Sequence, residues 1–277
     1  TVTGICDTAE VSILFDFAPC QLFSVNGCVW PGDANSDGIA NNYDVLAVGL
    51  AYNLAGFERS SPSNNWESQF CIDWDDSINI SIPDGTGAID SFALNAKYSD
   101  CNGNGLVEEE DIGVIALNYG ETHGKHSSTT TSDKLLWIDM PETAESNTWI
   151  SADIMLGTED NPIDAVHGLA FSVQYDTFLI DPTSTILSFE DSWLNAGDDN
   201  AIEFVKDFSD NGVMHIALSR TDQISVNGYG KVASINFFII DNIDGKTGAN
   251  EAIAFDLSIS DALIMNNTGN ADFIETQ

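Results

Sequence analysis

Two short segments of the chain carry oxygen-bearing side chains at alternate positions. Residues 33–44 and 100–111, here called loop 1 and loop 2, align without a gap inside a repeat that covers residues 32–53 and 99–120. In each loop Asp or Asn occupies positions one, three and five, glycine follows at six, and an acidic residue closes at twelve. When such a chain curls, the alternate oxygens all point inward, which is what a hard cation such as Ca²⁺ requires.

The spacing in both loops is that of an EF-hand loop. Glycine at position six permits the left-handed turn that brings the carbonyl of position seven onto the ion, and position twelve lies in the first turn of a following helix. Mg²⁺ demands a tight octahedron and fits poorly. The predicted Ca²⁺ ligands are Asp33, Asn35, Asp37, Ile39, Asn41 and Asp44 in loop 1, and Asp100, Asn102, Asn104, Leu106, Glu108 and Asp111 in loop 2.

An apolar helical pattern follows each loop. It consists of Val45, Val48 and Tyr52 after loop 1, and of Ile112, Ile115 and Tyr119 after loop 2. The alternative is a pair of Asx-rich turns that hold no metal, but two complete copies favour two calcium sites. Each loop supplies three carboxylates, so a loaded site keeps one negative charge.

A calcium loop and one helix, present twice, with Asp at position twelve and no helix before the loop, resembles the dockerin module. The resemblance implies a non-catalytic plug over about residues 32–120 that docks onto a cohesin. Dockerin repeats have a short linker, whereas residues 54–98 intervene here, with Trp66, Trp74 and the acidic residues Asp73, Asp75 and Asp76.

The positions that make contacts in dockerins also differ between the two loops. Positions ten and eleven are Asn42 and Tyr43 in loop 1 but Glu109 and Glu110 in loop 2. This difference argues against a symmetric docking surface and leaves open a calcium-stiffened structural unit.

Charge and composition restrict the classes of protein. The 277 residues include 44 acidic and 8 basic side chains, a net charge of −36, which repels nucleic acids and anionic membranes. Hydrophobic residues make up 43% of the chain, too many for an acidic disordered polymer. The length predicts two folded domains.

Cysteine usage predicts a secreted protein. Five cysteines, none in a CxxC pair, lie within the first 101 residues, and we expect two disulfides and one thiol; they are Cys6, Cys20, Cys28, Cys71 and Cys101. The sequence does not fix the pairing, although we expect Cys71 to pair with Cys101. No segment has transmembrane length and no signal peptide is recognisable, so we expect a mature chain or a segment of a larger one. Residues 1–31 suggest two short strands, at 11–17 and 21–25, as at the end of a preceding module.

Residues 121–132 contain no apolar residue and are rich in Ser and Thr, which predicts a flexible linker. Its two histidines, His123 and His126, are expected to be solvated. Beyond it, period-two alternation predicts the strands of an all-β sandwich or jelly roll over residues 133–277. The alternating residues are Ile150, Ala152, Ile154 and Leu156; Leu169, Phe171, Val173 and Tyr175; Ala233, Ile235, Phe237 and Ile239; and Ile253, Phe255, Leu257 and Ile259.

The order of segments in residues 133–277 resembles a cohesin. The resemblance rests on residues 135–140, 168–176 before Asp181-Pro182, 230–239, and 259–264 before 267–270. It implies a β-sandwich that recognises its partner through one face. A carbohydrate-binding sandwich or another adhesin module is the alternative.

No catalytic arrangement stands out, and we expect a non-enzyme. The chain has no GxSxG, phosphate loop or HExxH motif. His167 is expected at a strand end, His215 within the sandwich, and acid pairs such as Glu190 and Asp191 are expected in so acidic a chain. Sugar stacking is the alternative to core packing for Trp66, Trp74, Trp149 and Trp193.

Taken together, the fold class is mainly β, with a small α calcium-binding module before the sandwich. The function expected is a calcium-stabilised, extracellular scaffold or adhesin segment of a cell surface. Plug-like and socket-like modules on one chain predict head-to-tail assembly with copies of itself into a filament, and an intramolecular clasp is the competing arrangement. A carbohydrate-binding module of a secreted protein is the alternative function.

Overall fold

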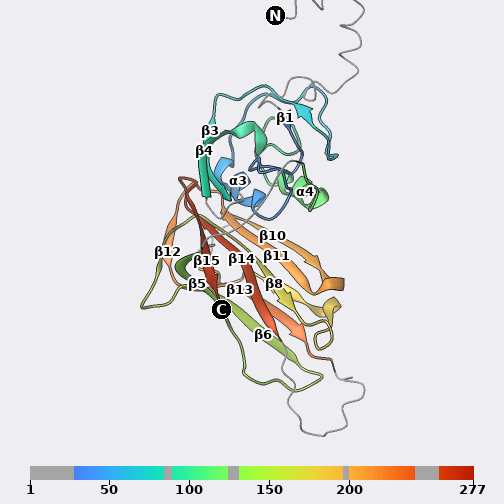
Figure 1. The fold of residues 1–277 in the computed structure, drawn as a ribbon, viewed down its shortest axis with the longest axis vertical. Coiled ribbons are helices and arrows are strands. Elements are labelled where there is room, and N and C mark those ends of the chain that lie inside the picture. The colour runs from blue at the N-terminus through green and yellow to red at the C-terminus, as the bar shows by residue number, and fades with distance from the viewer. Residues whose placement is uncertain (1–27, 84–88, 124–130, 196–199, 241–255) are drawn as a thin grey trace, which may run out of the picture. The chain divides into compact units, whose positions relative to one another are not determined.

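A computed structural model describes residues 28–83, 89–123, 131–195, 200–240 and 256–277. It divides into two compact units, one formed by Thr1–Ile78 with Ala93–His126 and one by Asn79–Phe92 with Ser127–Gln277. We call them the loop module and the sandwich (Figure 1). The strands expected at 11–17 and 21–25 lie outside the described residues, as do Cys6, Cys20 and His126.

The loop module contains the two predicted helices, which are confirmed. They are α3 (Asp44–Ala51) and α4 (Glu110–Leu117), and each has the carboxylate of loop position twelve in its first turn. No helix precedes either loop in the described residues: loop 1 follows β1 (Cys28–Val29) and loop 2 follows the single 3₁₀ turn η2 (Ala96–Tyr98). After Asp44 every residue of α3 is apolar, and all eight of its residues are buried. A helix without a polar face must be covered on every side.

The segment between the repeats is held by buried polar side chains. Trp74 is buried and its Nε1 donates to the carbonyl of Phe57 at 3.2 Å. The fully buried Lys97 donates from Nζ to Asp73 Oδ1 at 2.6 Å. Arg59, also buried, donates from Nη2 to the carbonyl of Asp100 at 2.9 Å. The segment is therefore part of the packing of loop 2 and not a loose insertion.

The same segment contributes short strands. They are β2 (Gln69–Phe70), which pairs with β1, and the hairpin of β3 (Ser77–Pro83) and β4 (Ile89–Asn95). Residues Asn79–Phe92 of this hairpin group with the sandwich, although the sequence analysis placed them in the module that contains the loops.

The sandwich is built from a nine-stranded sheet in the order β10-β11-β8-β14-β15-β5-β6-β13-β9. All its pairs are antiparallel except β15 with β5. β7 and β12 form a separate pair. The strands are β5 (Thr131–Asp139), β6 (Trp149–Leu156), β7 (Ile163–Val166), β8 (Gly168–Tyr175), β9 (Ile186–Ser188), β10 (Ala201–Phe208), β11 (Val213–Arg220), β12 (Val226–Gly228), β13 (Gly230–Phe238), β14 (Leu257–Met265) and β15 (Ala271–Thr276).

One hydrophobic core joins the two halves of this sheet. Phe171, Ile216 and Ile264 from β8, β11 and β14 share a cluster with Ile154 and Ile235 from β6 and β13. The alternation predicted for β6 is confirmed, because Ala152, Ile154 and Leu156 are buried while the residues between them are more exposed. Residues 253 and 255 of the last predicted strand lie outside the described residues. The prediction of a mainly β sandwich is thus confirmed.

The outer face of the sheet, turned away from this core, is also apolar. Residues paired directly across strands lie on the same face. One row across five strands is Phe204, Ala217, Ala170, Leu263 and Phe273, and the next row is Ile202, Ser219, Gly168, Met265 and Ala271. All are buried, with Phe204 at 4% exposure and Leu263 at 1%, yet none belongs to the core cluster. This face is therefore a second apolar surface.

No helix among the described residues is long and apolar enough to cross a membrane.

The expected pairing of Cys71 with Cys101 is wrong, because both are free and buried thiols. Each sulfur is turned towards a nearby carbonyl, that of Cys71 towards Ile72 at 3.6 Å and that of Cys101 towards Tyr98 at 4.0 Å. Cys28 is disulfide-bonded.

Both thiols should be chemically silent until the chain unfolds. Burial raises the pKa of Cys71 and Cys101, so little reactive thiolate forms at neutral pH. We expect an alkylating reagent to leave both unmodified in the native chain and to label both in denaturant without reductant, as read by peptide mass spectrometry. Cys28 is the internal control and stays unlabelled until reductant is added. Recovery of a peptide that joins Cys71 to Cys101 would contradict the structure.

Candidate calcium sites

The two loops have the same backbone conformation. Gly38 and Gly105, at position six, both have φ +88°, in the left-handed region that favours glycine. Position four is also left-handed in both, with φ +59° at Ser36 and +82° at Gly103. The repeat in the sequence is thus a repeat in three dimensions.

The closing carboxylate spans each loop in the same way. Asp44 accepts from the backbone N–H of Asn35 at 3.0 Å with one oxygen and of Asn41 at 2.7 Å with the other. Asp111 accepts from the equivalent N–H groups of Asn102 and Glu108, both at 2.9 Å. In each repeat a carboxylate in the first turn of the helix therefore ties positions three, nine and twelve together.

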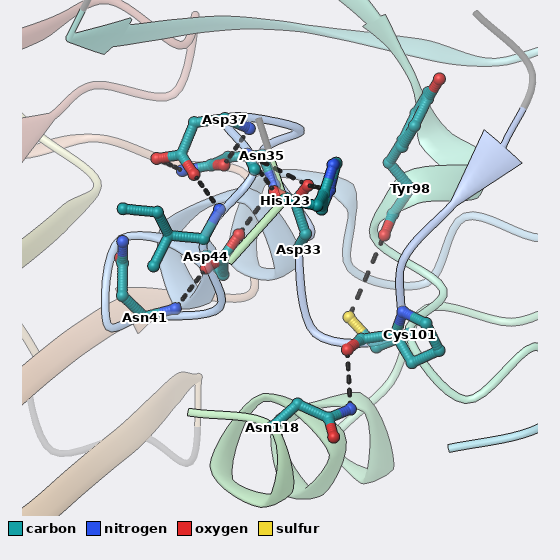
Figure 2. Close-up of polar contacts among 12 residues, drawn as sticks. Asp33, Asn35, Asp37, Asn41, Asp44, Tyr98, Cys101, Asn118 and His123 are labelled. Atoms are coloured by element: carbon teal, nitrogen blue, oxygen red, sulfur yellow. Dashed lines mark hydrogen bonds and ion pairs between the residues drawn. The ribbon is translucent and has the colours of Figure 1, made fainter. Parts of the chain in front are cut away.

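The remaining side-chain oxygens also accept from equivalent backbone groups. Asp33 accepts from Gly38 N–H at 3.1 Å, and Asp100 accepts from Gly105 N–H at 3.0 Å. In each loop the side chain at position three accepts from the backbone N–H of position five, and the side chain at position five accepts from the N–H of position seven. All four bonds are 2.9 Å long, and their donors are Asp37 and Ile39 in loop 1 and Asn104 and Leu106 in loop 2. Figure 2 shows the side chains of loop 1 gathered along its curl.

The burial of several carboxylates in each loop is unfavourable without a bound cation. Burial, followed by the charge of Asp33, raises the pKa of Asp37 to about 7. Burial, followed by the charges of Asp37 and Asp33, holds the pKa of Asp44 well above its usual range. In loop 2 burial raises the pKa of Asp111 to about 7 and also raises that of Asp100. A bound cation would offset the cost of burying these charges.

The donor set fits a hard cation. All twelve predicted ligands lie in the two loops and offer only oxygen, from carboxylates, carboxamides and a backbone carbonyl. Within the described residues, no three His, Cys, Asp or Glu side chains converge closely enough to make a metal site by themselves. A site in either loop thus depends on its Asn and carbonyl oxygens as well, and calcium binding stays a prediction.

Each loop pairs with the segment that follows the helix of the other repeat. We call residues 53–56, after α3, exit segment 1, and residues 120–123, after α4, exit segment 2. Single antiparallel bridges join Ile39 to Thr122 and Leu106 to Ala55, which are equivalent positions of the repeat. Three hydrogen bonds accompany each bridge. Beside the Ile39 bridge they are Gly120 N–H to Ala40 O, Ala40 N–H to Glu121 O and His123 N–H to Gly38 O. Beside the Leu106 bridge they are Asn53 N–H to Val107 O, Val107 N–H to Leu54 O and Gly56 N–H to Gly105 O.

This exchange fixes the part of each loop that carries the position-seven carbonyl. The residues on either side of Ile39 are hydrogen-bonded to exit segment 2, and those on either side of Leu106 are bonded to exit segment 1. Neither repeat can complete its loop without the other.

His123 does not behave as a solvated linker residue, and that expectation is wrong. Its Nε2 lies 2.7 Å from Asp33 Oδ2, and its ring stacks on Trp30 with centroids 4.4 Å apart. Trp66 packs at an angle against both rings. Little in the sequence indicates this contact, because residues 121–132 contain no apolar residue. The one available signal is the position of His123 just beyond the end of the second repeat.

Loop 2 has a different basic neighbour. The guanidinium of Arg59 opposes the rise in the pKa of Asp100, although burial is the larger cause. It reaches the loop through the carbonyls of Asp100 and Cys101. Arg59 was not anticipated from the sequence, where nothing distinguished it from a surface arginine.

Positions ten and eleven differ even more in the structure than in the sequence. Asn42 is buried and its backbone N–H donates to the hydroxyl of Tyr119 at 3.1 Å. Glu109 and Glu110 are exposed. The two loops therefore do not present equivalent surfaces at these positions.

Other residues considered from the sequence do not assemble into a site. His167 lies between β7 and β8, and His215 lies in β11 with its Nδ1 3.0 Å from Ser172 Oγ. Glu190 and Asp191 are exposed. Of the four tryptophans considered for sugar stacking, Trp74 is buried, Trp66 packs on aromatic rings, Trp193 packs against the core, and Trp149 is 56% exposed beside Phe238.

No protein-family model and no curated protein matches the sequence. Among solved structures the chain is similar to cohesin modules. A chain of a type II cohesin–X–dockerin complex from Acetivibrio cellulolyticus matches with a TM-score of 0.41 and 14% identity, over 52% of this chain and 95% of the other. Type II cohesin A11 from Bacteroides cellulosolvens matches with a TM-score of 0.38 and 14% identity, over 52% of this chain and 95% of the other. A cohesin module of a family 33 glycoside hydrolase from Clostridium perfringens matches with a TM-score of 0.36 and 13% identity, over 53% of this chain and 100% of the other.

The buried charge of loop 1 leads to a prediction about Asp37→Asn, which gives position five the residue that loop 2 already has. Without calcium, the variant removes a buried negative charge beside Asp33 and should raise the melting temperature of the loop module. A gain of about 1 kcal/mol corresponds to roughly 4–8 °C in a domain of this size. With calcium, the variant should gain less from the ion than the unmodified chain does. Calorimetry in EGTA and in calcium measures both effects.

The matched control is Glu109→Gln, an exposed acid of loop 2, which should change neither melting temperature. A lower melting temperature of Asp37→Asn in EGTA would contradict the account of the buried charge.

Proposed function

We propose that this chain is a non-catalytic, extracellular assembly segment. A dockerin-like loop module is stabilised by two Ca²⁺ ions, and a cohesin-like sandwich recognises a protein module through the outer face of its sheet. The observation that carries the proposal is the repetition of one closed, oxygen-lined loop with the same hydrogen bonds and buried carboxylates.

Calcium would act here as a structural ion. When bound, it supplies positive charge and a centre for the inward oxygens of a loop. The protein supplies the rest: the glycine at position six sets the curl, and the carboxylate at position twelve starts the helix. The exit segment of the other repeat then holds the backbone of positions six and eight, on either side of the carbonyl at position seven.

The outer face of the sandwich supports a role in recognition. Its two apolar rows cross β10, β11, β8, β14 and β15 on the side away from the core. These two rows are buried within the chain, so the part of this face that is open to a partner begins at the row beside them. The row next to them is polar, with Lys206, His215, Ser172 and Ser260, as at the rim of an interface.

The proposed partner of this face is the loop module of a second copy. The loop module exposes large apolar side chains of its own, namely Phe57, Phe70, Ile72 and Leu117. A contact between the sandwich of one copy and these apolar side chains of another copy would be heterologous, and a heterologous contact builds open filaments when it does not close. The disulfide of Cys28 suits an extracellular setting.

Calcium removal should destabilise the loop module. At free calcium about a thousandfold above the Kd, each site would add about 4 kcal/mol to the free energy of unfolding. Asp111→Ala should remove about one such increment, whereas Glu110→Ala, its exposed neighbour, should leave it intact. Calorimetric melts in calcium and in EGTA measure the difference. A loop module with the same melting temperature in both buffers would refute calcium binding.

Assembly should depend on calcium and on protein concentration. We expect sedimentation velocity to show species larger than a monomer as concentration rises in calcium, and their loss in EGTA. Leu117→Ser, at an exposed apolar position of the loop module, should weaken association, while Val205→Ser, at an exposed apolar position of the sandwich on β10, should not. A compact monomer at every concentration, by small-angle scattering, would favour the intramolecular clasp and contradict assembly.

A further inference from the structure

The two loops have similar internal hydrogen bonds, but a different residue of the opposite exit segment bonds to each loop. Gly56 and His123 are equivalent, because each lies twelve residues after the closing acid of its repeat. Their backbone roles are also equivalent, since Gly56 N–H donates to Gly105 O at 2.9 Å and His123 N–H donates to Gly38 O at 2.7 Å. At this position the two repeats therefore share the backbone bond and differ only in the side chain.

The His123 side chain makes a direct bond to the first residue of loop 1. Its Nε2 lies 2.7 Å from Asp33 Oδ2, and because a carboxylate only accepts, the ring N–H is the donor. The same oxygen accepts from Gly38 N–H at 3.1 Å. Asp33 is 2% exposed, so the accepting carboxylate is buried, while the His123 side chain is 30% exposed.

The position of the His123 ring is determined by more than this bond. The ring stacks on Trp30 at an interplanar angle of 15°, and Trp66 packs against it at 5.6 Å between centroids. The backbone N–H on Gly38 O holds the other end of the residue. His123 is thus a fixed donor aimed at Asp33, and Figure 2 shows the ring beside this carboxylate.

Loop 2 has no counterpart to this donor. A Cβ added at Gly56 would lie 2.1 Å from the ring of Trp74, so the indole occupies the space that a side chain would need. Asp100 accepts instead from the backbone N–H groups of its own loop, at Gly103, Asn104 and Gly105. A side chain from beyond the other repeat thus bonds the carboxylate of position one in loop 1, whereas in loop 2 Arg59 bonds only the backbone carbonyl of that position.

We propose that His123 is a positioning residue of the first calcium site, which holds Asp33 in its ligating orientation and makes the two sites of this duplicated module unequal. The inference rests on the proposed calcium binding. Hydrogen bonds to a ligating carboxylate fix its orientation, and their loss typically lowers metal affinity by about 10–100-fold.

Calcium titration calorimetry on the full chain tests the proposal one loop at a time. Asp111→Ala leaves loop 1 to be measured, and Asp44→Ala leaves loop 2. In the first background His123→Ala should lower calcium affinity by about 10–100-fold, and in the second it should have no effect. Thr122→Ala, on the exposed neighbour in exit segment 2, is the matched control and should change neither affinity.

Two further variants separate the hydrogen bond from packing. His123→Gln keeps a donor and should restore most of the affinity of loop 1, whereas His123→Phe keeps an aromatic ring against Trp30 and should not. Equal losses at both loops, an unchanged affinity at loop 1, or rescue by Phe and not by Gln would overturn the proposal. If the unmodified chain binds no calcium, the proposed function itself fails, which is a separate result.

Discussion

The cost of burying negative charge governs the loop module. Asp44 and Asp111 are fully buried, and each bonds through both oxygens to its own loop. These bonds close the loops and start the helices, but they do not remove the repulsion among three carboxylates in each loop. His123 and Arg59 bring partial compensation from outside the loops. The curl, the helix starts and the position of the exit segments all depend on how this charge is balanced.

The exchange of exit segments turns two repeats into one structure. A single loop and helix is too small to bury its apolar side, as for other repeated units. Here the repeats also share backbone hydrogen bonds, since exit segment 1 completes loop 2 and exit segment 2 completes loop 1. The long segment between the repeats does not disturb this arrangement, because Trp74, Lys97 and Arg59 pack it against loop 2. The duplication is therefore a single cooperative module with an approximate internal symmetry.

Features encoded by local spacing could be predicted from the sequence. The position-six glycines, the helices after the loops and the alternation of β6 follow from residue type and period, and the structure has each of them. Contacts between distant segments could not be predicted in this way. His123 was expected in solvent because its neighbours are polar, yet it packs on Trp30, and Cys71 and Cys101 were expected to pair, yet each sulfur lies beside a local carbonyl. Composition describes a segment's own solubility, whereas these contacts depend on a partner elsewhere in the chain.

The stack of His123 on Trp30 also has a mechanical consequence. Trp30 stands just before loop 1 and His123 stands at the end of exit segment 2, so this stack joins the two ends of the repeated structure. A force that separates residues 30 and 123 would therefore act on this stack and on the hydrogen bonds between residues 38–40 and 120–123. The stack and these hydrogen bonds thus resist separation of the two ends of the repeated structure.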